Sequence, residues 1–547
     1  MTRAVFGTDE PPANSRRIVV GRLSFDFAAG AVRDVRVDGV ELLRGIAFLV
    51  RDPIWATLAA TLAATVNDVV VDEADGRAWL SWRARVDGFA WTAQIEAEAD
   101  GLLFRAEGAA TADLSVNRVG FVVLHPIDGF AGTAVEIEHT DGTRATVYMP
   151  HAVSPHQPAS DVAALTHTIA GLVVRVAMAG DAFEMEDQRN WTDASFKTYV
   201  RPLSRPRPFI LRAGEAVSQS VRLTVSGVAT QPVAAVRGSV GTMPEIALTA
   251  DAADALSLRA ALDLLRPQWL HLRLDAADAP GPTIERREAL LLDLRVASTS
   301  DLAAFAGLTP DAVALASETD MPGLLDVART TFPNAAVGVG VRSHFTELNR
   351  RRPPPDATVL VHATSAIVHA ADDRTVIESL EALHSVFASA RALAPAAAYR
   401  PGPCTIGDPV GPAANLHGGR VPATRRDPRH GASFAAAWAV GVLAAAARGG
   451  VASISFGTPS GDFSLLADGR PTPLGHLVRA AAALAGRAVT VGTDRIEGDG
   501  FVLRANLTDA PVTLEAGMAV LGPVGWVAPT GGVLGPYGVA RSAPWLQ

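Results

Sequence analysis

"WLHLRLDAADAPGPTIERREALLLDLRV", residues 269–296, carries two short apolar runs joined by a polar link that contains Gly and Pro. From residue 245 onward, such runs alternate with stretches of helical period. Eight strands with intervening helices over about 240 residues are typical of a (β/α)8 barrel. A doubly wound open sheet is the alternative, but no GxGxxG fingerprint or phosphate loop supports it. We expect strands at 245–250, 269–274, 289–296, 312–317, 336–341, 358–362, 393–399 and 451–456, and helices at 254–266, 322–331, 375–392, 430–448 and 474–486.

The regions on either side of the barrel read as β structure. Residues 15–228 alternate apolar and polar side chains and turn at Gly and Asp, which predicts ten or more strands of a large antiparallel sandwich. The tail returns to short strands punctuated by Gly and Pro. We therefore predict a multidomain α/β plus β fold: an N-terminal β-sandwich (1–238), a central TIM-like (β/α)8 barrel that carries catalysis (239–486) and a small C-terminal β domain (487–547).

Composition narrows the class of protein. The chain has 547 residues, 48% of them hydrophobic, and its 48 Lys and Arg against 57 Asp and Glu give a net charge of −9. That balance argues against a nucleic-acid partner and suits a small, uncharged substrate. The single cysteine, Cys404, excludes an internal disulfide and a multi-cysteine metal site. With no apolar signal core and no membrane-length apolar run, we expect a cytoplasmic bacterial protein without a membrane partner; the oligomeric state stays open.

One polar segment stands out, "FEMEDQRNWTDASFKTY" (183–199). It contains Lys197, the only lysine of the chain, in a protein that otherwise uses arginine. The bland alternative is a charged hairpin loop at the edge of the sandwich. Because the segment is also rich in aromatic residues, we expect it to be ordered and to reach the barrel mouth. Its candidate site residues are Arg189, Asn190 and Lys197, which would meet sugar hydroxyls or an oxyanion, Trp191, and Glu186 and Asp187, which would contact substrate or hold those cations.

The barrel contributes the remaining candidates, since working residues of this fold lie at the carboxyl ends of its strands. Glu347 and His369 are the leading catalytic candidates there. The alternatives are a surface ion pair of Glu347 with Arg350, and a helix N-cap at Asp372 or Asp373. His125 is equally consistent with a structural histidine. Candidate substrate contacts are Asn349, Arg350, Asp372 and His125; other polar residues at strand ends are Asp275, Glu318, Asp320, His344, Asp408 and Asp462.

No cofactor is predicted. The chain has no HxH and no HExxH motif, so no metal site can be read from its sequence. A carboxylate and histidine site assembled in space stays open.

Four stretches resemble bacterial D-apionate lactonases: "FEMEDQRNWTDASFKTYVRPL" (183–203), "FTELNRRRPPP" (345–355), "VHAADD" (368–373) and "DPRH…AAWAVGVL" (427–443). The resemblance covers about residues 15–490 and implies a barrel of glycoside-hydrolase type with β domains, which opens D-apionolactone to D-apionate. Two places depart from the family pattern. The strand 8 end, "YFETTGWRG" in the family, is "SFGTPSGDF" here, with Gly457 in place of a Glu; the strand 7 end, "RPRFNP" in the family, is "YRPGPCTIG" here.

The expected reaction is hydrolysis of a sugar-acid lactone by activated water. Glu347 would act as base, helped by His369, while Lys197 or Arg189 would hold the oxyanion. Asn349 and Trp191 would position the sugar. Two alternatives remain: a TIM-barrel glycoside hydrolase with Glu318 and Glu347 as its carboxylate pair, and a non-catalytic carbohydrate-binding paralogue, which the missing strand 8 Glu favours.

Overall fold

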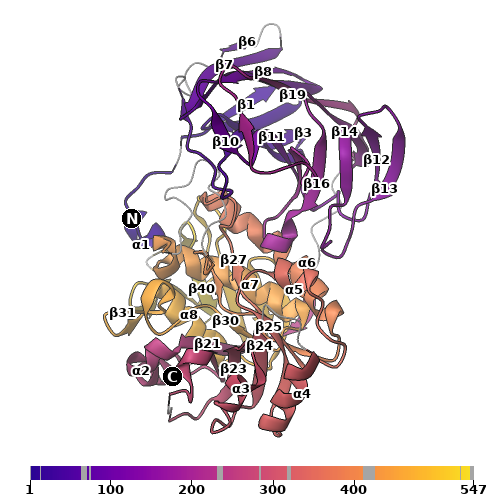
Figure 1. The fold of residues 1–547 in the computed structure, drawn as a ribbon. Helices are drawn as coiled ribbons and strands as arrows, with labels where there is room; N and C mark the ends of the chain where they lie inside the picture. The colour runs from indigo at the N-terminus through magenta and orange to yellow at the C-terminus, as the bar shows by residue number, and fades with distance from the viewer. Residues whose placement is uncertain are drawn as a thin grey trace.

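The computed structural model describes residues 2–12, 14–62, 70–72, 76–230, 238–282, 285–316, 322–410, 426–529 and 531–542. It shows a β-sandwich above a barrel, with a small β domain beside the barrel (Figure 1). This is the predicted fold class.

The N-terminal unit is built from one antiparallel sheet of 17 strands that curls into a sandwich. Its strands alternate buried and exposed side chains; β8 is a clear example, because successive side chains of a strand point to opposite faces. The strands are β1 Arg16–Val20, β2 Leu23–Ala28, β3 Ala31–Val37, β4 Val40–Arg51, β5 Thr61–Leu62, β6 Val70–Asp72, β7 Arg77–Val86, β8 Phe89–Glu98, β9 Gly101–Ala110, β11 Arg118–His125, β12 Ala134–His139, β13 Arg144–Tyr148, β14 Ala159–Ile169, β15 Leu172–Ala179, β16 Phe183–Asp187, β17 Phe196–Val200 and β19 Ala216–Gly227, with β10 Leu114–Val116 and β18 Phe209–Leu211 as a separate pair.

The register of the central strands gathers charge on one face of this sheet. Arg51 of β4 lies opposite Arg118 of β11. Lys197 of β17 lies between Leu124 of β11 and Glu186 of β16. Directly opposed residues on neighbouring strands point to the same face.

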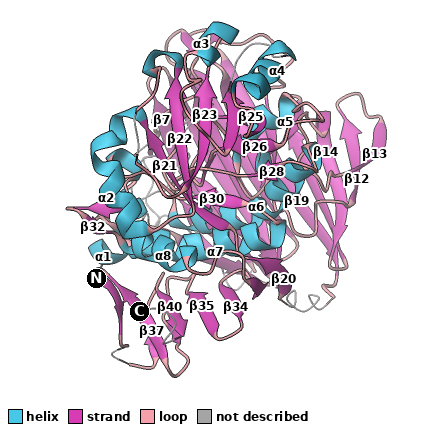
Figure 2. Cartoon of the chain, turned by 90° about the horizontal axis from the view of Figure 1, so that it is seen from below, coloured by secondary structure: helices cyan, strands magenta, loops and turns pink. Residues whose placement is uncertain are grey.

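The barrel consists of eight parallel strands, as predicted. Backbone bonds from Ala452 N to Tyr399 O (2.9 Å) and from Ser455 N to Pro401 O (3.3 Å) join β28 to β30 and so close the sheet into a barrel. Helices surround the strands in Figure 2. The strands are β21 Glu245–Asp251, β22 Trp269–Asp275, β23 Ala289–Arg295, β24 Ala312–Ala316, β25 Ala336–Val341, β26 Val359–His362, β28 Ala398–Tyr399 and β30 Ser453–Ser455, and the helices are α2 Ala255–Leu265, α3 Thr299–Ala303, α4 Pro322–Thr331, α5 Phe345–Arg350, α6 Asp373–Leu393, α7 Ser433–Gly449 and α8 Pro473–Ala482.

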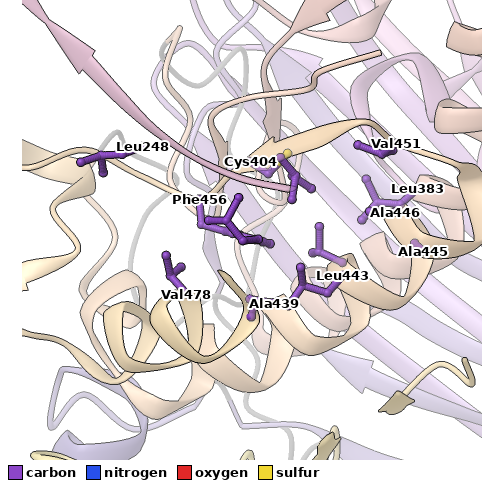
Figure 3. Close-up of a cluster of buried hydrophobic side chains, with 14 of the residues drawn as sticks. Leu248, Leu383, Cys404, Ala439, Leu443, Ala445, Ala446, Val451, Phe456 and Val478 are labelled. Atoms are coloured by element: carbon purple, nitrogen blue, oxygen red, sulfur yellow. The ribbon is translucent and has the colours of Figure 1, made fainter. Parts of the chain in front are cut away.

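Helix α7 is the centre of the barrel-side core. It is apolar on every face, which is typical of a helix that is buried all round. In Figure 3 its Ala439 and Leu443 share a cluster with Leu248 of β21 and with Phe456, which follows β30. Strands of the C-terminal sheet also contact α7. This helix therefore joins the barrel to the small β domain.

The small β domain takes one strand from ahead of the barrel. β20 (Ser239–Thr242) pairs with β33, whereas the sequence analysis counts residue 239 onward as barrel. The boundaries at 238 and 486 stay predictions. The sheet contains β20, β33 Ala488–Val491, β34 Arg495–Gly498, β35 Phe501–Ala505, β37 Met518–Gly522, β38 Gly525–Val527 and β40 Val539–Ser542; the remaining elements are α1 Thr2–Phe6 and the short pairs β27 Thr364–Ser365 with β29 Cys404–Thr405, β31 Leu466–Ala467 with β32 Arg470–Pro471, and β36 Val512–Thr513 with β39 Val533–Leu534.

Ion pairs tie the sandwich to the first turns of α6. Arg33 of β3 donates to Asp372 (3.2 Å) and to Glu378 (2.9 Å). Arg44 of β4 donates to Glu381 at 2.9 Å. Because α6 follows barrel strand β26, these contacts hold the sandwich over the carboxyl end of the barrel (Figure 1).

Candidate active site

The polar segment 183–199 forms a rigid bridge to the barrel. Between β16 and β17 it makes a short 3-10 helix, η2 (Gln188–Trp191), whose N-cap is Asp187. This helix packs against α5 and α6. The expectation that the segment reaches the barrel mouth agrees with this placement.

Arg189 anchors that bridge. Its side chain is fully buried and forms a two-point ion pair with Asp187, with Nε to Oδ1 at 2.8 Å and Nη2 to Oδ2 at 2.7 Å. Its other donors reach the carbonyls of Pro150 and His151 and the hydroxyl of Ser385. All five guanidinium N–H groups thus have protein acceptors, which assigns Arg189 and Asp187 to positioning the segment.

Asn190 and Asn349 form a second connection between the polar segment and the barrel. Asn349 of α5 donates to Asn190 Oδ1 at 2.9 Å and to Val153 O at 3.0 Å. Asn190 in turn donates to Ser154 O at 2.6 Å. Both side chains are buried, so they lock η2 onto α5 rather than present amides to a sugar.

Two histidine–carboxylate pairs flank Trp191. His369, between β27 and α6, meets Asp193 Oδ2 through Nδ1 at 2.6 Å. His344, at the start of α5, lies 3.3 Å from Asp408 through Nε2. The indole of Trp191 contacts both imidazoles, with ring centroids 5.8 Å from His369 and 5.6 Å from His344. Both pairs join elements far apart in sequence, so local sequence does not indicate that Asp193 meets His369.

The Asp193–His369 pair has the properties of a general base. Burial lowers the pKa of His369, although Asp193 acts in the opposite direction, so the imidazole is neutral at pH 7. With Nδ1 held by Asp193, the Nε2 atom makes no hydrogen bond to any described residue. Both side chains line a cavity of about 630 Å³ between the sandwich and the barrel. A neutral imidazole oriented by a carboxylate is a common proton acceptor in catalysis.

Lys197 lies beside this pair. It is buried and forms an ion pair with Glu186. Burial lowers the pKa of Lys197 to about 8, against the opposing effect of Glu186. Burial by itself would raise the pKa of Glu186, but Lys197 and His369 overcome it and hold that pKa at about 2. The site therefore contains a paired ammonium that titrates close to neutral pH.

Arg51 and Arg118 complete the cluster, and neither can be recognised from its local sequence. Both are buried on the face that carries Lys197. The guanidinium of Arg118 lies over the ring of Tyr199, 4.0 Å from its centroid. An arginine at the end of an apolar strand looks like the solvent-exposed end of that strand, and only the fold shows that it is buried.

The other predicted residues have separate positions. Glu347 is half-buried on α5, and its carboxylate makes no hydrogen bond or ion pair with a described residue. Arg350, one turn later, is exposed and lies 5.9 Å from the Trp191 ring centroid. Asp372 is the N-cap of α6. His125 is buried in the sandwich, stacked on Phe130 and bonded to Thr198; Glu318 and Asp320 lie outside the described residues.

A polar network at the carboxyl end of the barrel contains Asp275, which the sequence indicates as a strand-end residue, and Arg342, Asp293 and His271, which it does not. Arg342, at the end of β25, donates to Asp293 Oδ1 at 3.0 Å and to Asp275 Oδ1 at 2.6 Å. Asp293 also meets His271 at 3.3 Å. These groups satisfy one another across β22, β23 and β25, so we read them as packing of the barrel interior.

The end of strand β30 has no room for a side chain at Gly457. A Cβ there would lie 2.3 Å from Phe463 O and 3.1 Å from Leu465. The following loop closes over the glycine through a bond from Thr458 N to Phe463 O at 2.9 Å. The carboxylate that the family pattern has at this place is therefore absent, and the local backbone excludes it.

Two family models match this chain. The N-terminal domain of D-apionate lactonase matches residues 3–228, and its TIM barrel domain matches residues 247–486. The chain belongs to the D-apionate lactonase family. The D-apionate lactonase of Brucella anthropi is 35% identical, over 88% of this chain and 90% of that protein.

Solved structures resemble the chain only distantly. A beta-arabinopyranosidase is 10% identical over 96% of this chain and 99% of its own, with a TM-score of 0.28. A putative aldose 1-epimerase from Escherichia coli K12 is 11% identical over 40% of this chain and 100% of its own, with a TM-score of 0.26. Likeness at this level carries no inference about this chain.

Two further searches bear on the site. Within the described ranges, no group of three or more His, Cys, Asp or Glu side chains is arranged to hold a metal ion. No helix in the part of the chain that the structure describes is long and apolar enough to cross a membrane.

Proposed function

We propose that this protein hydrolyses the lactone of a sugar acid, of the D-apionolactone type, to the open-chain aldonate. Membership of the D-apionate lactonase family supports a lactone hydrolase. The observation that carries the mechanism is the hydrogen bond between Asp193 and His369 at the wall of the cavity, close to Lys197.

In the proposed reaction, His369 Nε2 takes a proton from water as the water oxygen attacks the lactone carbonyl. The carbonyl oxygen becomes an oxyanion, which the positive charge of Lys197 stabilises. The ring C–O bond then breaks, and the leaving alkoxide takes up a proton. Lactone and water thus give aldonate and one proton, with Asp193 keeping the imidazole in the required orientation throughout.

Glu347 is the proposed source of the proton that the leaving alkoxide takes up. It lies in the first turn of α5 at three-residue spacing from both His344 and Arg350, so the three share a side of the helix. His344 and Arg350 both contact Trp191. We therefore assign Glu347 and Arg350 to the sugar side of the site, and the indole of Trp191 to its floor.

A second candidate follows from Gly457. If the family chemistry needs a carboxylate at the end of β30, this chain would bind sugar acids without turnover. A pH-indicator assay over a panel of aldonolactones that includes D-apionolactone separates the two functions, and repeating it after dialysis against a chelator tests for a metal. Opening of at least one lactone above the uncatalysed rate supports the proposal. Aldonate binding by calorimetry with no turnover across the panel would replace it with the binding function.

A further inference from the structure

Arg51 is a buried cation with unused hydrogen-bond donors. Its side chain is 3% exposed, and its Nη1 makes a long bond to Trp55 O at 3.4 Å. Its Nε and Nη2 atoms have no partner among the described residues. Buried donors are nearly always paired, because an unmade hydrogen bond leaves the cost of desolvation uncompensated.

The unused donors form a particular edge of the guanidinium. Among the described residues, five other arginines use the same Nε and Nη2 edge to bind a carboxylate at two points, two of them being Arg44 with Glu41 and Arg259 with Asp263. Arg189 does so with Asp187 at 2.8 and 2.7 Å. The others are Arg273 with Asp251 at 2.8 and 2.7 Å, and Arg429 with Asp427 at 3.0 and 2.6 Å. The Nε–Nη2 edge has the spacing of the two oxygens of a carboxylate.

The nearby carboxylates are already engaged. The charge of Arg51 acts on the carboxylates of Glu186 and Asp193. Glu186 is paired with Lys197, however, and Asp193 is bonded to His369. Neither makes a hydrogen bond to Arg51 within the described part of the chain.

The position of Arg51 relates it to the proposed chemistry. Its charge also acts on Lys197 and on His369. Arg51 lies opposite Arg118 in the sheet, and Arg118 and Lys197 both lie over the ring of Tyr199, so Arg51 belongs to the cluster that contains Lys197. During lactone opening the carbonyl oxygen and the attacking water oxygen become the two oxygens of one carboxylate, and this carboxylate forms next to His369.

We propose that the Nε–Nη2 edge of Arg51 is a carboxylate-binding site, which takes the carboxylate of the ring-opened sugar acid and the oxyanion that precedes it. This inference rests on the proposed function, and it assigns Arg51 to the polar head of a 2-hydroxy acid rather than to the sugar hydroxyls.

The electrostatics agree with that assignment. Burial, together with the neighbouring charge of Arg118, lowers the pKa of Arg51 to about 9. The guanidinium thus lacks a counter-charge of its own among the described residues. A bound anion would supply it, so carboxylate binding should stabilise the folded protein.

The test compares acids with their uncharged counterparts in the wild-type protein and three variants. Calorimetry measures the binding of sodium D-apionate and sodium D-gluconate, each against the alditol of the same carbon skeleton. Arg51→Met removes the guanidinium and its charge, and Arg51→Lys keeps a positive charge without the paired Nε and Nη2 donors. Arg105→Met is the matched control, since Arg105 is a half-exposed arginine of the same sheet whose partner is Glu96.

The proposal expects the wild type to bind aldonate at least ~10-fold more tightly than alditol. Arg51→Met should lose that preference, Arg51→Lys should retain part of it, and the control should match the wild type; charged hydrogen bonds of this kind are worth roughly 10- to 100-fold. Aldonate should raise the Tm of the wild type but not of Arg51→Met. Equal binding of acid and alditol by the wild type, or unchanged aldonate binding by Arg51→Met, would overturn the assignment.

Two outcomes separate this inference from the proposed function. Aldonate binding through Arg51 without lactone opening would support the carboxylate site and refute the proposed hydrolase function. Lactone opening that persists unchanged in Arg51→Met, with unchanged aldonate binding, would support the proposed hydrolase function and refute the carboxylate site. Without ligand, Arg51→Met should melt no lower than the wild type, because it removes an unpaired buried charge. Misfolding of both Arg51 variants would show that the guanidinium serves the fold and would overturn the site.

Discussion

Replacement of Asp187 by Asn tests the buried Asp187–Arg189 ion pair, which holds the polar segment 183–199 in place. The Asp187 carboxylate accepts four hydrogen bonds, from Arg189 Nε (2.8 Å), Arg189 Nη2 (2.7 Å), Arg189 N (3.3 Å) and Ser154 N (2.9 Å). An Asn keeps the shape but has one acceptor oxygen, and its amide would face donors. The charge of Arg189, which is fully buried, would lose its only described ion-pair partner.

The size of the effect follows from that geometry. Breaking a buried ion pair from one side costs about 3–5 kcal/mol, since the remaining charge is left without a partner. For a domain of a few hundred residues this corresponds to a Tm lower by roughly 6–20 °C. Because η2 carries Trp191 and precedes Asp193, catalysis should fall as well, in protein that is still folded.

Differential scanning calorimetry of Asp187→Asn checks the expected loss of stability, beside Asp113→Asn as control. Asp113 pairs with Arg212 at the surface of the same sandwich, where both side chains are more than half exposed. The control should melt with the wild type, because surface ion pairs contribute little. If Asp187→Asn also melts within 1–2 °C of the wild type, a range small beside the expected shift, the pair does not anchor the segment and our description of the ion pair is wrong.

Three further predictions concern the chemistry and the strand 8 end. Gly457→Ala should lower the Tm without improving activity, because its Cβ would lie 2.3 Å from Phe463 O; a stable and more active variant would contradict this. Glu347→Gln should lower kcat on the hydrolysed lactone by ~100-fold, in line with general acid–base contributions, and full activity would remove Glu347 from the mechanism. In wild type, kcat/KM should rise with pH through a value below 6.5, as His369 loses its proton, and fall near pH 8, as Lys197 loses its own. In Lys197→Arg the alkaline limb should move upward, measured after subtraction of uncatalysed hydrolysis; an unmoved limb would assign it to another group.

The barrel could be predicted closely from its sequence, because each strand is a short apolar run set between polar links. The strand expected at 336–341 is β25, and the helix expected at 322–331 is α4. Helix α5 was not predicted, since six residues are too few to show a helical period.

The composition of the site could be predicted only in part. The segment 183–199 was recognisable by its density of polar residues and its lone lysine. Its partners were not, since Asp193 and His369 are 176 positions apart and meet only when the sandwich covers the barrel. Local sequence also could not show that Arg189 is hydrogen-bonded to Asp187 while two donor atoms of Arg51 have no partner among the described residues. That difference arises from burial.

The most direct test of the account is kcat/KM of His369→Asn on the lactone that the wild type opens, measured at pH 7 in protein whose melting curve matches the wild type. Asparagine can replace the hydrogen bond to Asp193 but cannot take a proton from water. We predict a loss of at least ~100-fold. Activity within twofold of the wild type would show that water is activated elsewhere, and the proposed active site would have to be abandoned.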